Sequence, residues 1–445
     1  MAESTNTIQK EIQDREAKEK RELRRKRRRR NQILAILTLL LFVCLIVAII
    51  GTGVWYIMHR GAGKTAGGGA ATTEETTIDN LFESEDEIVK PEETNTEPAL
   101  TPEQQLDAIL DEAFISQMPL EDKVAGLFIV TPESITGVNK AVKAGDGTKD
   151  ALNKYAVGGI VYASQNMQDA AQFTEMVSNT TLYSRYALFT CVAEEGGSST
   201  SLEKAGLADK TDSEQAMGTG ADAAKAYEAS GKIADSMLTY GLNLNFAPVA
   251  DLATVQDSYL KDASYGSDAA LAASFVTSAV QGMQEKGISS CLKYFPGAAD
   301  MKEDPAKGMA SSERTAEQLA AEEFTVFKAG IDAGADMVMV GHVAVPALTG
   351  DNTPCSLSSA VITDKLRNEL GFNGVIITDA MNKGAITEYY EADEAAILAL
   401  KAGCDMILCP DDFEKAYNGV LEAVQNGTIS EERINDSLRR IYRIK

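Results

Sequence analysis

The sequence predicts an α/β protein, a (β/α)8 TIM-type barrel preceded by a single transmembrane helix. From residue 104 onward, short apolar and β-branched runs alternate with longer amphipathic stretches, the pattern of a parallel sheet covered by helices on both faces. Eight such units fit a barrel of about 250 residues with insertions. A doubly wound open sheet is the alternative, because strands counted from one sequence can be missed or added. Residues 33–58 form an uncharged apolar run that is long enough to cross a membrane.

The apolar run 33–58 has the flanks of an uncleaved signal anchor. Trp55 and Tyr56 lie at its far end, where aromatic rings favour the membrane interface. A basic run, residues 24–30, precedes it, so the positive-inside rule keeps the tail 1–32 in the cytoplasm and exports the rest. Two alternatives are a nucleic-acid or nuclear-targeting role for the basic run and a cleaved signal peptide, although no A-x-A cleavage motif follows.

The chain therefore divides into four predicted parts. The cytoplasmic tail (1–32) and the anchor (33–58) are followed by a linker (59–103) rich in Gly, Thr and acidic residues. Low hydrophobicity and like charge keep such a segment extended. The last part, residues 104–445, is the barrel, which we expect outside the cytoplasm at the cell membrane.

The composition excludes several kinds of function. A net charge of −24 argues against nucleic-acid binding by the barrel, because phosphate recognition needs clustered Lys and Arg. His59 and His342 are the two histidines, so no mechanism can use two histidines in the barrel. The five cysteines of the barrel form no CxxC pair, and we expect buried free thiols and no metal site. We expect no organic cofactor, because neither a GxGxxG after the first strand nor a P-loop is present.

The predicted barrel elements follow from these patterns. The strands are expected at residues 124–130, 159–162, 187–192, 242–247, 288–293, 337–340, 375–378 and 406–408. Longer amphipathic stretches predict helices at residues 221–240, 269–286, 316–333 and 362–370. The chemistry of such barrels sits at the C-terminal ends of the strands. Polar and glycine-rich residues gather there, at 193–197, 245–251, 293–297, 341–343 and 378–381.

Four motifs lie in order at these strand ends: NLNFAPVAD at 243–251, LKYFPG at 292–297, GHVAVPAL at 341–348 and ELGFNGVIITD at 369–379. In this order the sequence resembles family 3 glycoside hydrolases on the β-N-acetylhexosaminidase side. The likeness runs from about Leu106 to the C-terminus. It implies hydrolysis of amino-sugar glycans, such as those of a cell wall, by a retaining mechanism without a cofactor.

The resemblance also assigns roles to residues. It makes Asp379 the nucleophile of a double displacement, in which a second group protonates the leaving oxygen and then acts as base. Asp300 and Asp304 match aspartates of the family's acid/base loop. Lys293, Tyr294, Asp251 and His342 stand at substrate-binding positions.

Structural roles are the alternatives for these residues. Asp379 could cap a helix after the strand. Lys293 and Asp251 could form a buried ion pair that holds the barrel mouth together. His342 could serve as a structural residue at its strand end.

The sequence departs from the family pattern at the positions that transfer protons and bind the sugar. The family's acid/base histidine, in its D-S-H element, stands at Ala306 in this chain, and an alanine cannot act as an acid. The positions of the D-x-E-G-G-R-x-x-R motif and of the R-[SA]-F-G arginine are small residues: Ala193, Ser198, Ser201 and Ala263. Tyr294 replaces a further histidine. The lost arginines were planar, multi-donor clamps that small side chains cannot imitate.

Three hypotheses fit this mixture. The first is an active glycosidase in which Asp300, Glu303 or Asp304 replaces the acid/base histidine, since a carboxyl group can do that work. The second is an inactive barrel that binds surface glycans or partners. The third, an unrelated barrel enzyme with a phosphate or nicotinamide cofactor, lacks a supporting motif.

Overall fold

The computed structural model describes residues 102–445, apart from residues 199, 256 and 298–300. The predicted tail, the predicted anchor 33–58 and nearly all of the predicted linker lie outside the described residues. Among the helices that are described, none is long and apolar enough to cross a bilayer.

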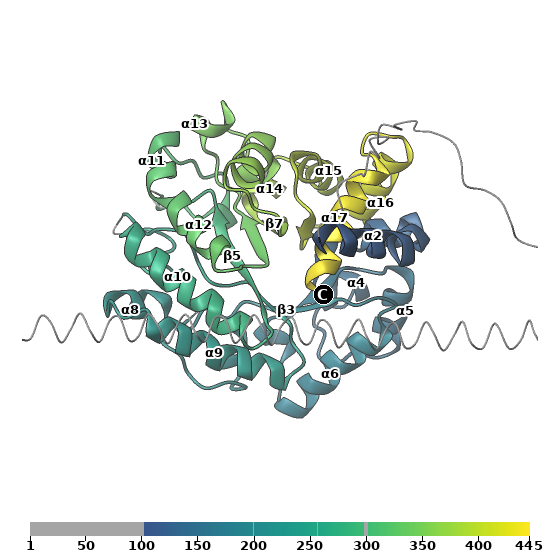
Figure 1. The fold of residues 1–445 in the computed structure, drawn as a ribbon. Coiled ribbons are helices and arrows are strands. Elements are labelled where there is room, and N and C mark those ends of the chain that lie inside the picture. Colours follow the sequence, from purple (N-terminus) through teal and green to yellow (C-terminus); the bar gives the residue numbers. More distant parts are fainter. Residues whose placement is uncertain (1–101, 199, 256, 298–300) are drawn as a thin grey trace, which may run out of the picture. The chain divides into compact units, whose positions relative to one another are not determined.

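Eight parallel strands close into a barrel in the order in which they occur along the chain, and β1 pairs with β8 to complete the ring (Figure 1). The strands are β1 (Phe128–Val130), β2 (Gly159–Val161), β3 (Phe189–Val192), β4 (Leu244–Asn245), β5 (Ser289–Phe295), β6 (Met337–Val340), β7 (Val375–Ala380) and β8 (Met406–Leu408). The closed ring confirms the predicted barrel and rules out the open, doubly wound sheet.

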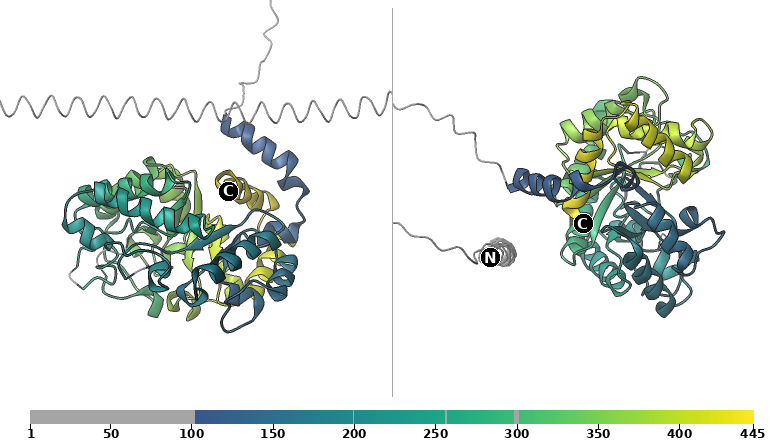
Figure 2. Two further views of the ribbon diagram at one scale, coloured as in Figure 1. Left: turned by 90° about the horizontal axis from the view of Figure 1, so that it is seen from below. Right: turned by 90° about the vertical axis from the view of Figure 1, so that its right-hand side faces the viewer.

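Helices surround this ring and connect its strands (Figures 1 and 2). The α-helices are α2 (Pro102–Ala113), α3 (Leu120–Ala125), α4 (Pro132–Thr136), α5 (Asp146–Lys154), α6 (Ala170–Tyr183), α7 (Ser201–Lys204), α8 (Glu214–Thr219), α9 (Ala224–Thr239), α10 (Ala269–Gln284), α11 (Ala316–Ala321), α12 (Glu323–Asp332), α13 (Pro346–Thr349), α14 (Gly384–Thr387), α15 (Ala392–Ala402), α16 (Phe413–Gln425) and α17 (Glu431–Ile444). The described residues also form four short 3-10 helices and one π-helix. The 3-10 helices are η1 (Ile115–Gln117), η2 (Ser164–Asn166), η3 (Pro305–Lys307) and η4 (Cys355–Leu357), and the π-helix is η5 (Ala360–Glu369).

Most predicted elements are present, with three differences. The predicted strand 124–130 was wrong in its first half, because Val124 and Ala125 end helix α3 and β1 begins at Phe128. A short apolar run has the same composition in a buried helical turn as in a buried strand. The predicted strand 242–247 keeps ladder pairing at two residues, Leu244 and Asn245. The predicted helix 316–333 is two helices, α11 and α12, that meet at Glu322.

The core fills the barrel and the space between its strands and helices. Strand residues such as Ile129, Leu292 and Ile376 are fully buried, and four of the five barrel cysteines are buried free thiols. Gly330 on α12 shows how closely the layers approach, because a Cβ atom there would lie 2.6 Å from a methyl group of Leu292. A larger residue at this position would push α12 away from β5.

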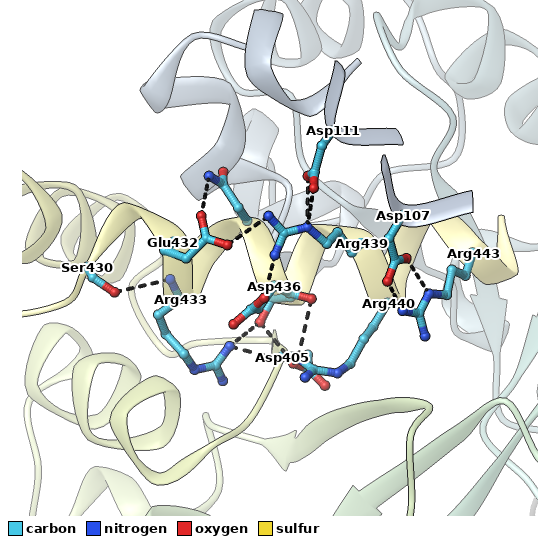
Figure 3. A network of polar contacts seen from close by, with 12 residues as sticks. Asp107, Asp111, Asp405, Ser430, Glu432, Arg433, Asp436, Arg439, Arg440 and Arg443 are labelled. Atoms are coloured by element: carbon cyan, nitrogen blue, oxygen red, sulfur yellow. Dashed lines mark hydrogen bonds and ion pairs between the residues drawn. The ribbon is translucent and has the colours of Figure 1, made fainter. Parts of the chain in front are cut away.

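A cluster of ion pairs lies at the N-terminal ends of the strands, opposite the face where the motifs gather (Figure 3). Asp405, directly before β8, is fully buried. Its carboxylate accepts hydrogen bonds from Ile376 N–H at 2.9 Å and Ser437 Oγ at 2.9 Å. It also lies 2.7 Å from an Arg367 nitrogen and 3.1 Å from an Arg440 nitrogen. The Asp405 cluster thus ties β7, β8, η5 and α17 together.

Helix α2 attaches to the same α17 through the outer side of this cluster. Arg439 Nε donates to Asp111 at 2.7 Å, and Arg443 Nε donates to Asp107 at 2.7 Å. Figure 3 shows these pairs linking the two helices, and α2 runs beside α17 in Figure 1. The first described helix is therefore part of the barrel's outer layer.

Candidate active site

A cavity of about 270 Å³ opens at the C-terminal ends of the strands. Its lining includes carboxylates, two tyrosines, a histidine and a lysine: Glu195, Asp304, Asp379, Tyr259, Tyr294, His342 and Lys383. Tyr294 and Asp379 stand at the C-terminal ends of β5 and β7, and the other residues come from loops that follow β3, β4, β5, β6 and β7. The strand-end clustering expected from the sequence is thus present, and the barrel brings five separate segments to one pocket.

Asp379 stands near the end of β7 and is 6% exposed. One of its oxygens accepts the N–H of Ala380 at 2.7 Å, and the other lies 2.7 Å from Lys383 Nζ. Burial works to raise the pKa of Asp379, but the Lys383 ammonium and these hydrogen bonds outweigh it and hold the pKa below its usual value. Asp379 is therefore ionised at neutral pH and faces the cavity. Its one backbone contact, to the next residue within β7, is not a helix cap.

Lys383 reaches Asp379 because it follows four residues later, at the start of α14. Its Nζ also lies 5.4 Å from the centre of the Tyr294 ring. Lys293 Nζ lies at 5.4 Å from the same ring centre. The Tyr294 ring thus lies near two ammonium groups in a cation–π arrangement. A histidine at this position would place a third titratable nitrogen group beside the two lysines.

Lys293 is buried and forms an ion pair with Glu195, which is buried as well. Glu214 on α8 lies close to this pair and accepts the N–H of Val249 at 3.1 Å. Burial and the neighbouring Glu195 charge raise the pKa of Glu214 well above its usual value. Asp251, the predicted partner of Lys293, accepts the N–H of Leu252 at 2.9 Å. The structure therefore gives Lys293 a clear partner, Glu195, that the sequence analysis did not name.

His342 uses both ring nitrogens within the protein. Nδ1 lies 2.7 Å from Ser356 Oγ, and Nε2 lies 3.0 Å from the carbonyl oxygen of Ala380. Because a carbonyl only accepts, Nε2 carries the hydrogen and Nδ1 accepts from the serine. Burial lowers the pKa of His342, so the ring is neutral. Its contact with Ala380 holds the backbone next to Asp379, a positioning role at the wall of the cavity.

The loop after β5 supplies Asp304 and Ala306 to the cavity wall. Asp304 is the N-cap of η3, and its side chain accepts the N–H of Ala306 at 2.9 Å. Asp300, a predicted alternative, lies outside the described residues, and Glu303 is exposed and absent from the cavity lining. Among the described residues of this loop, Asp304 is therefore the carboxylate that the fold brings to the same pocket as Asp379.

The sequence profile of the glycosyl hydrolase family 3 N-terminal domain matches residues 119–444. The chain belongs to glycoside hydrolase family 3. Its barrel is of the β-hexosaminidase-like kind. A β-hexosaminidase from Stenotrophomonas maltophilia is 30% identical over 284 residues, which cover 61% of this chain and 82% of that protein. A β-hexosaminidase from Xanthomonas campestris is 32% identical over 270 residues, 58% of this chain and 79% of that protein.

Solved structures of the family superpose on the barrel. A family 3 β-N-acetylglucosaminidase from Paenibacillus has 32% identity and a TM-score of 0.70, and the match covers 74% of this chain and 62% of that one. A family 3 glycosyl hydrolase from Mycobacterium smegmatis has 26% identity and a TM-score of 0.66, with 74% and 98% covered. This membership rules out the third hypothesis, an unrelated barrel.

Within this glycoside hydrolase family, the small residues at the motif positions have distinct surroundings in this chain. Ala263 and Ala306 line the cavity itself. Ser201 begins helix α7, and its N–H donates to the Glu194 carboxylate at 2.6 Å. Ser198 is exposed. Some positions where the family has larger side chains thus border the cavity in this chain, and another faces solvent.

Sequence reasoning missed three site residues: Lys383, Tyr259 and Glu195. The spacing of Lys383, four residues after Asp379, could have signalled a contact if a helical turn had been expected there. Tyr259 lies in a loop without a motif, and Glu195 lies in the strand-end segment 193–197, whose pattern does not show which residue it pairs with. Their placement depends on how the loops fold over the barrel.

Proposed function

We propose that this glycoside hydrolase hydrolyses O-glycosyl bonds of β-N-acetylhexosaminides by a retaining mechanism, with Asp379 as nucleophile. The observation that carries the proposal is the ionised, cavity-facing Asp379 together with a second carboxyl group, Asp304, in the same pocket. Retaining glycosidases need such a pair. The names of the β-hexosaminidase relatives support the amino-sugar substrate.

The proposed reaction has two displacements. Asp379 attacks the anomeric carbon while the glycosidic C–O bond breaks, and Asp304 acts as the general acid that gives a proton to the leaving oxygen. Water then attacks the glycosyl-enzyme, gives its proton to Asp304, and releases Asp379 as a carboxylate. Lys383 stabilises the departing carboxylate in this second step, because its ammonium group lies beside one of the Asp379 oxygens.

A second candidate function is glycan binding without turnover. Two observations favour it: Ala306 stands where the family places its acid/base histidine, and Lys383 engages one oxygen of the nucleophile. An ammonium group bound to the carboxylate weakens its nucleophilicity in the first step, while the pocket keeps its aromatic and polar lining.

Turnover of a chromogenic N-acetyl-β-glucosaminide by the purified full-length protein separates the two candidates. Hydrolysis should disappear in Asp379→Ala and fall strongly in Asp304→Asn. Asp169→Asn is the matched control, because Asp169 also caps a helix, by accepting Gln172 N–H, but lies on α6 outside the cavity lining. No turnover by the folded wild type, combined with measurable glycan binding, would favour the binding module.

The covalent step has its own test. A fluorinated glycoside that slows hydrolysis of the intermediate should add one sugar mass to the peptide that contains Asp379. Label on another residue would contradict the assignment of Asp379 as nucleophile. Label that requires Asp304 but not Asp379 would make Asp304 the nucleophile and Asp379 the acid/base.

We also propose that the chain is anchored in the cell membrane by residues 33–58, with the barrel on the extracytoplasmic side. The uncharged run of that segment and the basic run before it support this topology. Protease added to intact cells or spheroplasts should cleave the barrel from the membrane fraction and leave the tail 1–32 protected. Protection of the barrel in intact spheroplasts would contradict the topology.

A further inference from the structure

A second cavity, of about 260 Å³, lies between α14, α15 and α16 at the same end of the barrel. These helices follow β7 and β8 and are labelled near one another in Figure 1. The cavity is smaller than the roughly 300–1,000 Å³ typical of pockets for drug-sized ligands. Its size therefore suits one sugar ring.

One short segment forms the wall between the two cavities. Residues 379–387 run from the end of β7 through α14. Asp379 and Lys383 line the candidate active site, whereas Met381, Ile386 and Thr387 line the second cavity. The two cavities thus lie on either side of one chain segment.

The lining of the second cavity combines an apolar floor with open polar groups. Met381, Ile386 and Ala395 are buried side chains of the floor. Tyr390 is half-buried, and Asp411 is exposed at the rim just after β8. Within the described part of the chain, neither the Tyr390 hydroxyl nor the Asp411 carboxylate has a hydrogen-bond partner.

The other charged groups of the cavity are already paired. Lys415 Nζ lies 2.5 Å from Glu391, and Asp412 caps α16 by accepting the Lys415 N–H at 2.9 Å. The groups left open are therefore an aromatic face with a hydroxyl and one carboxylate. An aromatic face packs on the C–H face of a sugar, and a carboxylate accepts its hydroxyl hydrogens.

We propose that this second cavity is a saccharide subsite, which holds a further ring of an oligomeric amino-sugar glycan whose terminal ring occupies the candidate active site. The inference rests on the proposed function, because the first ring must bind beside Asp379. It names a substrate class, an oligosaccharide rather than a disaccharide or a single glycoside. Tyr390 supplies the packing surface and Asp411 the hydrogen-bond acceptor.

Calorimetric titration of the full-length Asp379→Asn protein with N-acetylglucosamine and its β-1,4-linked oligomers tests the subsite. We expect the pentamer to bind at least about tenfold more tightly than the monomer, a gain of about 1.4 kcal/mol. Tyr390→Ala should reduce that ratio to near one, and Asp411→Asn should reduce it in part. Tyr389→Ala is the matched control, because Tyr389 is adjacent and 53% exposed but does not line the cavity.

The outcomes distinguish failure of the subsite from failure of the proposed function. A pentamer-to-monomer ratio that Tyr390→Ala leaves unchanged, in a protein that binds the monomer, overturns the subsite alone. Binding of neither sugar, together with no turnover by the wild type, overturns both proposals. Thermal unfolding of each variant shows whether it is folded, and Tyr390→Phe, which removes only the hydroxyl, should keep most of the ratio if the ring itself provides the affinity.

Discussion

Two buried aspartates at opposite ends of the barrel have very different surroundings. Asp405, at the N-terminal end of β8, is surrounded by three arginines, a serine hydroxyl and a backbone N–H. Asp379, near the C-terminal end of β7, has one lysine and one backbone N–H and faces a cavity. One carboxylate is saturated with donors and sealed in protein, while the other keeps acceptor capacity toward the cavity.

The difference shows how a barrel separates stability from chemistry. Helix α17 lies against Asp405 at the N-terminal end of β8, where the buried charge is compensated by protein groups (Figure 3). The C-terminal ends are covered by loops that leave space for a ligand. A carboxylate with open acceptor capacity is found where a ligand can complete its contacts.

The largest expected effect is on activity. Asp379→Ala should lower kcat on a chromogenic glycoside by at least about 10⁴-fold, because loss of a nucleophile removes the covalent route. Its free energy of unfolding should fall by less than that of Asp405→Ala, because Asp379 has fewer charged partners. Equal activity of Asp379→Ala and wild type would contradict the functional difference between Asp379 and Asp405, since both would then be structural carboxylates.

The next effect is on stability. Asp405→Ala should lower the free energy of unfolding by about 3–5 kcal/mol, because it leaves three arginines near a buried site without their partner. Urea unfolding measures this. Asp332→Ala, which breaks the exposed pair with Lys328, is the control and should change stability little. A similar loss in both variants would show that the Asp405 cluster is no more stabilising than a surface pair.

Lys383→Met sharpens the comparison by removing the ammonium group that pairs with Asp379. The pKa of Asp379 should rise, so the acidic limb of the kcat/KM profile should move to higher pH. In the wild type the lowered pKa means that ionised Asp379 stabilises the fold above its ordinary value of 3.8, and this contribution is lost as the pH falls through the folded pKa. An unchanged acidic limb would mean that Lys383 does not set this pKa.

The smallest effect concerns His342, which holds the backbone beside Asp379. Because burial lowers its pKa from 6.5, the neutral ring favours the folded state above that pH, and this stability is lost as the pH falls through the folded pKa. His342→Gln can keep both hydrogen bonds and should cost about 1 kcal/mol at pH 8. Its unfolding free energy should then fall less between pH 7 and pH 5 than that of the wild type. Parallel pH profiles would contradict a role for His342 in this dependence.

The sequence predicted the fold well because the barrel strands are buried on both faces. Continuous apolar runs such as 337–340 and 406–408 are β6 and β8 with the same bounds. The run 124–130 failed because burial alone does not distinguish a helical turn from a strand. The helical break at Glu322 was not predicted either; the Arg314 guanidinium pairs with both Glu322 and Glu323 at this break, a contact that the sequence pattern does not show.

The sequence by itself determined the family, the eight strand–helix units, the position of Asp379 at a strand end and that of Asp304 in the loop after the fifth strand, because these depend on local apolar patterns and on motifs. The tertiary structure decided which charges meet. It paired Lys293 with Glu195, Lys383 with Asp379 and Asp405 with arginines of η5 and α17. Most of these partners are separated by many residues along the chain, and an ion pair forms only where the fold brings two side chains within about 4 Å. For that reason the difference between a sealed and an open carboxylate appears only in three dimensions.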